Sequence, residues 1–199
     1  MEILIIALPL IASILSGFFG KLIGDRNSEI ITSLLVSISA IMSAIVLYEV
    51  IFNQYQENII IASWISSGSL DVNWSMKIDP LSAIMLVVVT SVSSLVHVYS
   101  IGYMSHDPHK PRFMAYLSLF TFAMLMLVTS DNFIQLFFGW EGVGLCSYFL
   151  IGFWFKKETK FMLTANKINS ILIKITMIFF LFKKIPITPI VKITAPNVK

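Results

Sequence analysis

The sequence has little charge and a single cysteine. Only 13% of its 199 residues are Asp, Glu, Lys or Arg, while 57% are hydrophobic and the mean hydropathy is +0.85. A soluble domain carries about 25% charged residues, so the composition argues against a water-soluble globule. Cys146 alone excludes an internal disulfide, and no Cys/His cluster has metal-ligand spacing, so we expect no metal site. Lys plus Arg exceeds Asp plus Glu only by 14 to 11 and forms no single patch, which argues against nucleic-acid binding.

Long uncharged runs predict five transmembrane helices. At about 1.5 Å per residue, such runs approach or exceed the hydrocarbon thickness of about 30 Å. The helices are expected at about residues 2–24, 29–52, 80–104, 112–130 and 132–155. Glu2 stands where a cleaved signal peptide has a basic region, so we expect an anchoring helix there. Ser28 and Glu29 suit the start of the second helix. The predicted fold class is an all-α, polytopic membrane helix bundle.

The segment 53–79, between the second and third helices, is different in character. Residues 70–78 alternate between apolar and polar side chains after a Ser-Ser-Gly-Ser turn. This pattern predicts a β-hairpin at the membrane surface, with a disordered loop as the alternative. Trp64 and Trp74 suit the aromatic belt of a membrane interface.

The pattern weakens after residue 158. Residues 168–182 are apolar apart from Lys174, and they suit either a short sixth span or an interfacial helix. The remaining residues contain three prolines without periodicity, which predicts a disordered tail.

Basic residues gather on one side of the predicted membrane. If the spans alternate, one side has Lys77 alone, and the other has Lys21, Arg26, Lys110, Arg112, Lys156, Lys157 and Lys160. The positive-inside rule then places the N-terminus and the hairpin outward and the basic loops in the cytoplasm or matrix.

Glu141 is the one acidic residue deep inside a predicted span. A carboxylate at the bilayer centre costs about 2.5–3.5 kcal/mol, so we expect it to face protein or a hydrated cavity. There it is a candidate proton carrier, because burial and a nearby cation shift its proton affinity in opposite directions. The alternative is a structural carboxyl that hydrogen-bonds a neighbouring helix. On a helix it shares a face with Phe137, Gly144 and Tyr148, and the glycines at 139, 142 and 144 predict close helix approach or a local break.

Three other positions are weaker candidates. His97, in the inner half of the third span, suits either a proton relay or a packing residue. Lys174 suits either a proton carrier or a surface helix. His106 and His109, with an aspartate between them, have a superficial likeness to a metal site, but we interpret this proline-flanked loop as solvated.

The stretch 138–155, Phe-Gly-Trp-Glu-Gly-Val-Gly-Leu-Cys-Ser-Tyr-Phe-Leu-Ile-Gly-Phe-Trp-Phe, resembles the signature helix of an antiporter-like subunit of respiratory complex I. This family is called NADH dehydrogenase chain 5 or NADH-quinone oxidoreductase subunit L. The resemblance extends through Asp79-Pro80-Leu81-Ser82-Ala83 and residues 97–104, and covers about residues 1–157. It implies a proton-translocating membrane protein built from inverted helix repeats. Glu141 then matches the family's functional glutamate, whose partner is a lysine on a later helix.

The resemblance also implies the setting of the chain. NADH and quinone are used by other subunits, and no cofactor is expected in this chain. The expected partners are the lipid bilayer and other membrane subunits of complex I. The expected location is the bacterial inner membrane, with the mitochondrial inner membrane as the alternative.

After about residue 158 the sequence departs from the family pattern, which suggests a truncated or frameshifted product. We therefore expect a fragment that does not pump protons alone. One alternative is an accessory membrane protein or remnant without transport. Another is a subunit of a multisubunit cation/proton antiporter, although such subunits usually lack the Gly-Val-Gly that follows the glutamate.

Overall fold

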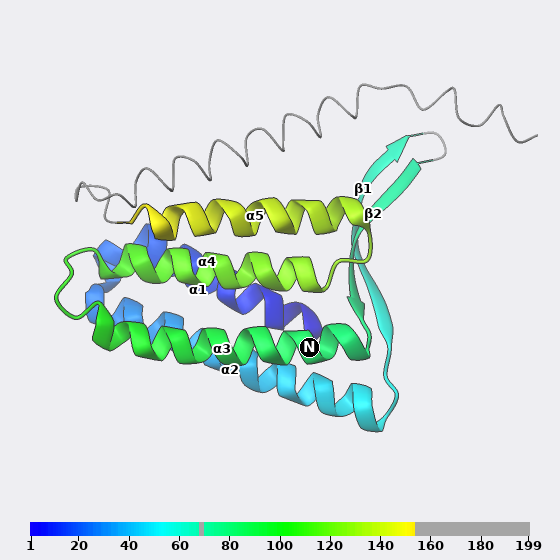
Figure 1. Ribbon diagram of the computed structural model, residues 1–199, viewed down its shortest axis with the longest axis horizontal. Coiled ribbons are helices and arrows are strands. Elements are labelled where there is room, and N and C mark those ends of the chain that lie inside the picture. The colour runs from blue at the N-terminus through cyan, green and yellow to red at the C-terminus, as the bar shows by residue number, and fades with distance from the viewer. Residues whose placement is uncertain (68–69, 154–199) are drawn as a thin grey trace, which may run out of the picture. The chain divides into compact units, whose positions relative to one another are not determined.

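The computed structural model describes residues 1–67 and 70–153, which form five helices and a β-hairpin (Figure 1). The helices are α1 (Glu2–Ile23), α2 (Asp25–Phe52), α3 (Pro80–Tyr103), α4 (Lys110–Val128) and α5 (Phe133–Ile151). All five are long and apolar enough to cross a membrane. The predicted fold class, a helical membrane bundle with a small hairpin between the second and third helices, is confirmed. The helix and the tail predicted after residue 158 lie outside the described residues.

Helices α1 and α2 are joined by a single residue, Gly24. Its φ of 88° lies in the left-handed region, which glycine adopts without a Cβ penalty. Because the chain turns so sharply there, α2 begins at Asp25, about one turn before the expected start. Ser28 and Glu29 are therefore inside the helix and are only 1% and 4% exposed. The prediction that they mark the helix start was wrong.

Helix α3 has a well-defined beginning. The backbone N–H of Ser82 donates to Asp79 Oδ1 at 2.7 Å, and the backbone N–H of Asp79 donates to Ser82 Oγ at 2.8 Å. Pro80 occupies the first turn, where its missing N–H leaves no intrahelical bond unmade. These bonds satisfy two backbone donors that the helix itself leaves without partners.

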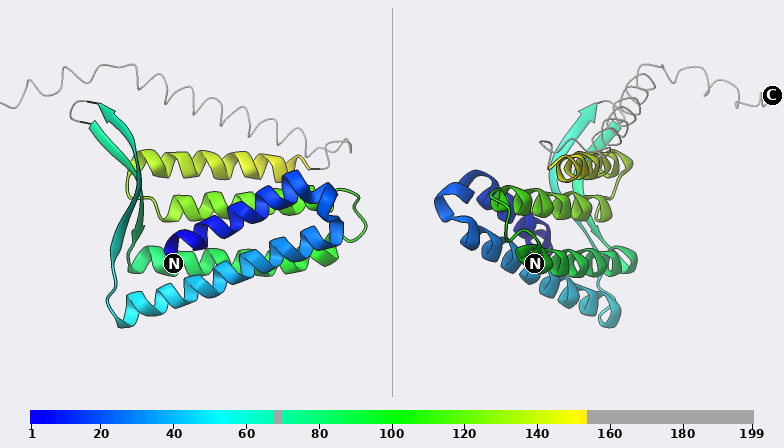
Figure 2. Two further views of the ribbon diagram at one scale, coloured as in Figure 1. Left: turned by 180° about the vertical axis from the view of Figure 1, so that it is seen from behind. Right: turned by 60° about the vertical axis from the view of Figure 1, so that its left-hand side comes forward.

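The helices pack in a defined order. Helix α2 packs against α1 and α3, and α4 packs against α1 and α5. Helix α4 lies between α3 and α5 (Figures 1 and 2). The turn at Gly24 and the loop between α3 and α4 lie at one end, which we call the basic end. The hairpin and the α4–α5 connection lie at the other, which we call the hairpin end.

The hairpin consists of β1 (Glu57–Ser67) and β2 (Leu70–Ile78), paired antiparallel from Glu57 opposite Ile78 to Ser67 opposite Leu70. Its inner side chains extend the core of the bundle. Met76 and Ile78 are each 1% exposed and pack in one cluster with Leu86 of α3 and Leu125 of α4. The predicted hairpin is thus present, and it closes the apolar interior at the hairpin end.

Polar groups hold the hairpin to the α4–α5 connection. The side chain of Gln135 donates to Ser75 O at 2.7 Å and accepts from the backbone N–H of Ser75 at 3.1 Å. Asn132 Nδ2 donates to Asn73 O at 2.9 Å, and the backbone N–H of Lys77 donates to Thr129 O at 2.9 Å. The free edge of β2 is therefore paired with protein groups.

Gly139 brings α4 and α5 into close contact. A Cβ at this position would lie 2.8 Å from Leu127 Cα and 2.9 Å from its backbone nitrogen. The prediction of close helix approach is confirmed here, while α5 runs without a break from Phe133 to Ile151.

We predict that Gly139→Ala destabilises the bundle by about 1–3 kcal/mol, because its methyl group would overlap the backbone of α4. Gly102→Ala is the matched control, since a Cβ there meets nothing within 4 Å. Thermal unfolding in detergent measures both variants. Equal melting temperatures for the two would contradict the close approach.

We predict that Asp79→Ala lowers stability by about 1 kcal/mol at neutral pH through loss of the cap. The hydrogen bond from the Ser82 backbone holds the pKa of the Asp79 carboxyl below its ordinary value. A lowered folded-state pKa makes this contribution complete above the unfolded value of about 3.9, and it is lost as the pH falls through the folded value. Asp79→Asn keeps the cap without titrating. Unfolding measured against pH would contradict the assignment if wild type and Asp79→Asn showed the same acid dependence.

Candidate functional site

Glu141 is the ninth residue of α5 and is half-buried. The buried residues of this helix are Gln135, Gly139 and Cys146, which mark the face that packs on α4. At about 100° per residue, Glu141 lies roughly 140° around the helix from that face. The carboxyl is thus on the side of α5 that does not face α4.

His97 lies between α3 and α4 and is fully buried, at 0% exposure. Its Nδ1 is 2.7 Å from the carbonyl oxygen of Ser93, and its Nε2 is 3.0 Å from Ser118 Oγ. A carbonyl oxygen only accepts, so in the neutral ring Nδ1 donates to Ser93 O and Nε2 accepts from the Ser118 hydroxyl. Both ring nitrogens therefore have partners, and the imidazole links the two helices.

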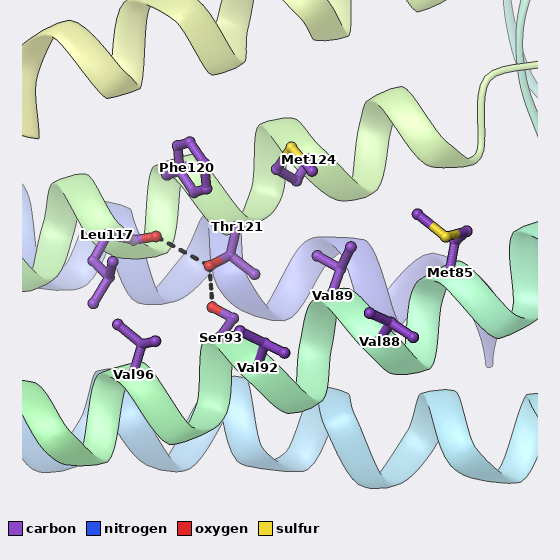
Figure 3. Close-up of a pocket in the computed structure, with 10 residues that line it drawn as sticks. All are labelled: Met85, Val88, Val89, Val92, Ser93, Val96, Leu117, Phe120, Thr121 and Met124. Carbon is purple, nitrogen blue, oxygen red and sulfur yellow. Dashed lines mark hydrogen bonds between the residues drawn. The ribbon is translucent and has the colours of Figure 1, made fainter.

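The hydrogen-bonded chain continues one turn along from His97. The hydroxyls of Ser93 and Thr121 form a short hydrogen bond, and Thr121 Oγ1 also donates to Leu117 O at 3.0 Å. Figure 3 shows this pair at an apolar groove of about 360 Å³ between α3 and α4. The other lining residues are Met85, Val88, Val89, Val92, Val96, Leu117, Phe120 and Met124. Because its two hydroxyls bond each other, the groove offers few polar groups to a hydrophilic ligand.

Among the described residues, the structure does not bring His97 and Glu141 together. Helix α4 lies between α3, which carries His97, and α5, which carries Glu141 (Figure 1). Lys174 lies outside the described residues. In the loop before α4, the backbone N–H of His109 donates to Asp107 Oδ1 at 2.8 Å, which is a local turn contact. Within residues 1–67 and 70–153, no group of three or more His, Cys, Asp or Glu residues is arranged to hold a metal ion.

One buried polar cluster was missed by sequence reasoning. Glu29 and Ser33, one turn apart on α2, are 4% and 6% exposed, and Lys110 Nζ is 4.0 Å from Glu29 Oε1. Glu29 escaped notice because it was assigned to a helix start beside the charged loop. The signal in the sequence was the spacing of four residues between Glu29 and Ser33, which places both on one helical face.

Two family models match the sequence. The first, described as complex I chain 5 N-terminus, matches residues 64–114, and the second, described as NADH:quinone oxidoreductase/Mrp antiporter, TM, matches residues 130–191. NADH-ubiquinone oxidoreductase chain 5 of Arabidopsis thaliana is 57% identical over 157 residues, which are 79% of this chain and 24% of that protein. NADH-quinone oxidoreductase subunit L of Rickettsia conorii is 51% identical over 165 residues, which are 83% of this chain and 24% of that protein. This chain is similar to the N-terminal part of complex I chain 5 and to subunit L.

These matches confirm the predicted resemblance. The chain spans about a quarter of the length of these relatives. The second family match runs to residue 191, past residue 158, where the sequence predicts that the resemblance ends. Family-like sequence thus continues into the part of the chain that the structure does not describe.

A solved structure shares the fold. A chain of the membrane-bound sulfane sulfur reductase, an archaeal respiratory membrane complex, matches 85% of this chain with a TM-score of 0.68 and 18% identity. The match covers 33% of that chain. The helix arrangement of this chain therefore also occurs in a chain of that complex.

We predict that His97→Leu destabilises the bundle by about 1–3 kcal/mol, because it leaves the buried Ser118 hydroxyl without its imidazole partner. Ser118→Ala removes the other half of the pair. In denaturant unfolding, the double variant should lose less stability than the sum of the single variants, since the two residues share one interaction. Strictly additive losses would show that the imidazole and the hydroxyl do not interact.

Proposed function

We propose that this chain forms the first five transmembrane helices of a proton-translocating membrane subunit of an NADH:quinone oxidoreductase. The observation that supports this most is the 57% identity to a chain 5 protein over 157 residues. The second family match includes α5 and therefore Glu141. In this proposal NADH and quinone bind to other subunits of the complex, and this chain contributes proton-binding groups and no cofactor site of its own.

Glu141 is the proposed proton carrier. Its carboxyl lies on the side of α5 that does not face α4, so a cationic partner on a later helix of the subunit would approach from that side. A cation close to the carboxyl favours the charged form, and its withdrawal favours proton uptake. Such a pair titrates as one unit, so movement of the partner changes the proton affinity of Glu141.

His97 has a more limited role in this proposal. In the neutral imidazole, Nδ1 donates one hydrogen bond and Nε2 accepts the other. The ring passes a proton onward only if both hydrogen bonds reverse their direction. The carbonyl of Ser93 cannot release a proton, so a relay would need the ring to turn. The geometry favours the interpretation of His97 as a packing residue that connects α3 and α4.

The proposed orientation places the hairpin end outward and the basic end in the cytoplasm or matrix. The basic end carries Lys21, Arg26, Lys110 and Arg112, whereas the hairpin end carries Lys77. Chain 5 relatives are 49% to 57% identical to this chain and subunit L relatives 50% to 51%, so the proposed location stays the bacterial inner membrane, with the mitochondrial inner membrane as the alternative. The proposed partners are membrane lipids and other membrane subunits of complex I.

A cation/proton antiporter subunit is the second candidate function. It is favoured by the description of the second family model, which joins complex I with Mrp antiporters. The two candidates differ in what drives proton movement: NADH oxidation in one, and a cation gradient in the other.

We predict that the tagged chain migrates with NADH-oxidising activity in native gels of solubilised membranes. Glu141→Gln should then lower NADH-driven proton transport relative to NADH oxidation, because glutamine carries no exchangeable carboxyl proton. Glu49→Gln, which changes a carboxyl near the C-terminal end of α2, is the matched control. The chain alone in proteoliposomes should move no protons, since it spans about a quarter of the length of its relatives.

Three outcomes would decide against this assignment. Migration of the chain apart from every NADH-oxidising species would favour an accessory membrane protein. Sodium-dependent proton movement that needs no NADH would favour the antiporter candidate. Equal proton transport by Glu141→Gln and Glu49→Gln would remove Glu141 as the carrier.

A further inference from the structure

The basic end of the bundle contains a buried carboxyl with an incomplete hydrogen-bond shell. Glu29 Oε1 is buried and has no hydrogen-bond partner among the described residues. Within the described part of the chain, the nearest cation is Lys110 Nζ, which lies 4.0 Å away and so is beyond hydrogen-bond distance. Ser33 Oγ, one turn further along α2, is also buried and has no hydrogen-bond partner within the described part of the chain. Glu29, Ser33 and Lys110 together are called the inner cluster below.

Neighbouring buried hydroxyls show that the bundle normally pairs such groups. Ser16 Oγ bonds both Ser28 Oγ and Pro111 O at 2.6 Å, and Thr32 Oγ1 donates to Ser28 O at 2.9 Å. Buried polar atoms without a protein partner usually bind ordered water or an ion. Two such atoms on adjacent turns of one helix face therefore point to a ligand between them and Lys110.

The charges of the inner cluster favour a water molecule over a metal cation as its bound ligand. Lys110 already supplies a positive charge to the carboxylate, and a second cation would be repelled by it. Among the described residues, the other charges that act on Glu29 are Asp25 and Arg26 of its own helix, and these are of opposite sign. A water molecule, in contrast, donates to Glu29 and accepts from Lys110 while it also bonds the hydroxyl of Ser33.

The depth of the cluster also suits water. Helix α2 has 28 residues and is about 42 Å long, which exceeds the hydrocarbon thickness of about 30 Å. Glu29 is its fifth residue and so lies near the membrane interface. The side chain of Lys110 is 21% exposed while that of Glu29 is 5% exposed. The ammonium group therefore connects the buried carboxyl with the aqueous side.

We propose that the inner cluster is a bound-water site at which Glu29 takes up and releases a proton from the basic side of the membrane. The site is separate from Glu141 and does not depend on the proposed NADH-linked function. Protonation of Glu29 replaces the carboxylate with a neutral acid that donates to the same water, so the site holds its water in both states.

Ser33→Ala distinguishes bound water from an empty pocket. A buried hydroxyl without any partner is unfavourable, so its removal would leave the melting temperature unchanged or raise it. If the hydroxyl binds water, its removal lowers the melting temperature by a few degrees. Ser39→Ala is the control, because Ser39 Oγ donates to Ile5 O at 2.7 Å and its loss should lower the melting temperature. An unchanged or raised melting temperature for Ser33→Ala overturns the proposal.

Infrared difference spectra of the whole chain in lipid nanodiscs test the proton. On acidification we expect a protonated-carboxyl band that disappears in Glu29→Gln and changes position in Ser33→Ala and in heavy water. Glu49→Gln is the control and should leave this band in place. Absence of any band that depends on Glu29 overturns the proposal even where Ser33→Ala lowers the melting temperature, because the site then holds water without exchanging a proton.

Discussion

The constraint on which this structure depends is that a polar group inside a bilayer must find its partner within the protein. Lipid offers no hydrogen bonds, so a buried hydroxyl that bonds a neighbouring helix commits its own helix to one rotation and one depth. Ser43 of α2 bonds Thr90 of α3 at 2.7 Å, and Ser37 bonds Ser94 at 2.8 Å. Ser39 donates to Ile5 O of α1 at 2.7 Å. These contacts hold α2 between α1 and α3, where apolar packing alone would allow the helices to slide.

The same constraint explains the hairpin. Its inner face extends the core, while its backbone is paired on one side by Gln135, whose amide both donates to and accepts from Ser75. Trp64, Trp74 and Phe138 then form a T-shaped aromatic cluster beside it, with centroid distances of 4.9 and 5.2 Å. The hairpin thus fixes the start of α5, and with it the position of Glu141 along the bundle.

Apolar runs were sufficient to predict the helices, and period-two alternation was sufficient to predict the hairpin, because both patterns reflect local geometry. The burial of Glu29 was not predictable in this way, since it depends on a one-residue turn at Gly24. The pairing of His97 with Ser118 depends on which helix lies beside α3. The periodicity of the sequence does not show which helices are neighbours. Glu141 was recognisable as a charge within a span, but the side of α5 on which it lies followed only from which residues of that helix are buried.

Glu29 and Glu141 lie in different surroundings within the bundle. Glu29 has its cation within the five helices, since Lys110 of α4 is 4.0 Å away. Glu141 lies on the side of α5 that does not face α4. Because a midplane carboxyl is costly in lipid, that side is where contact with further protein stabilises the charge most. The bundle therefore separates an internal acidic group near the membrane interface from a second one, which lies halfway along α5 on the side that does not face α4.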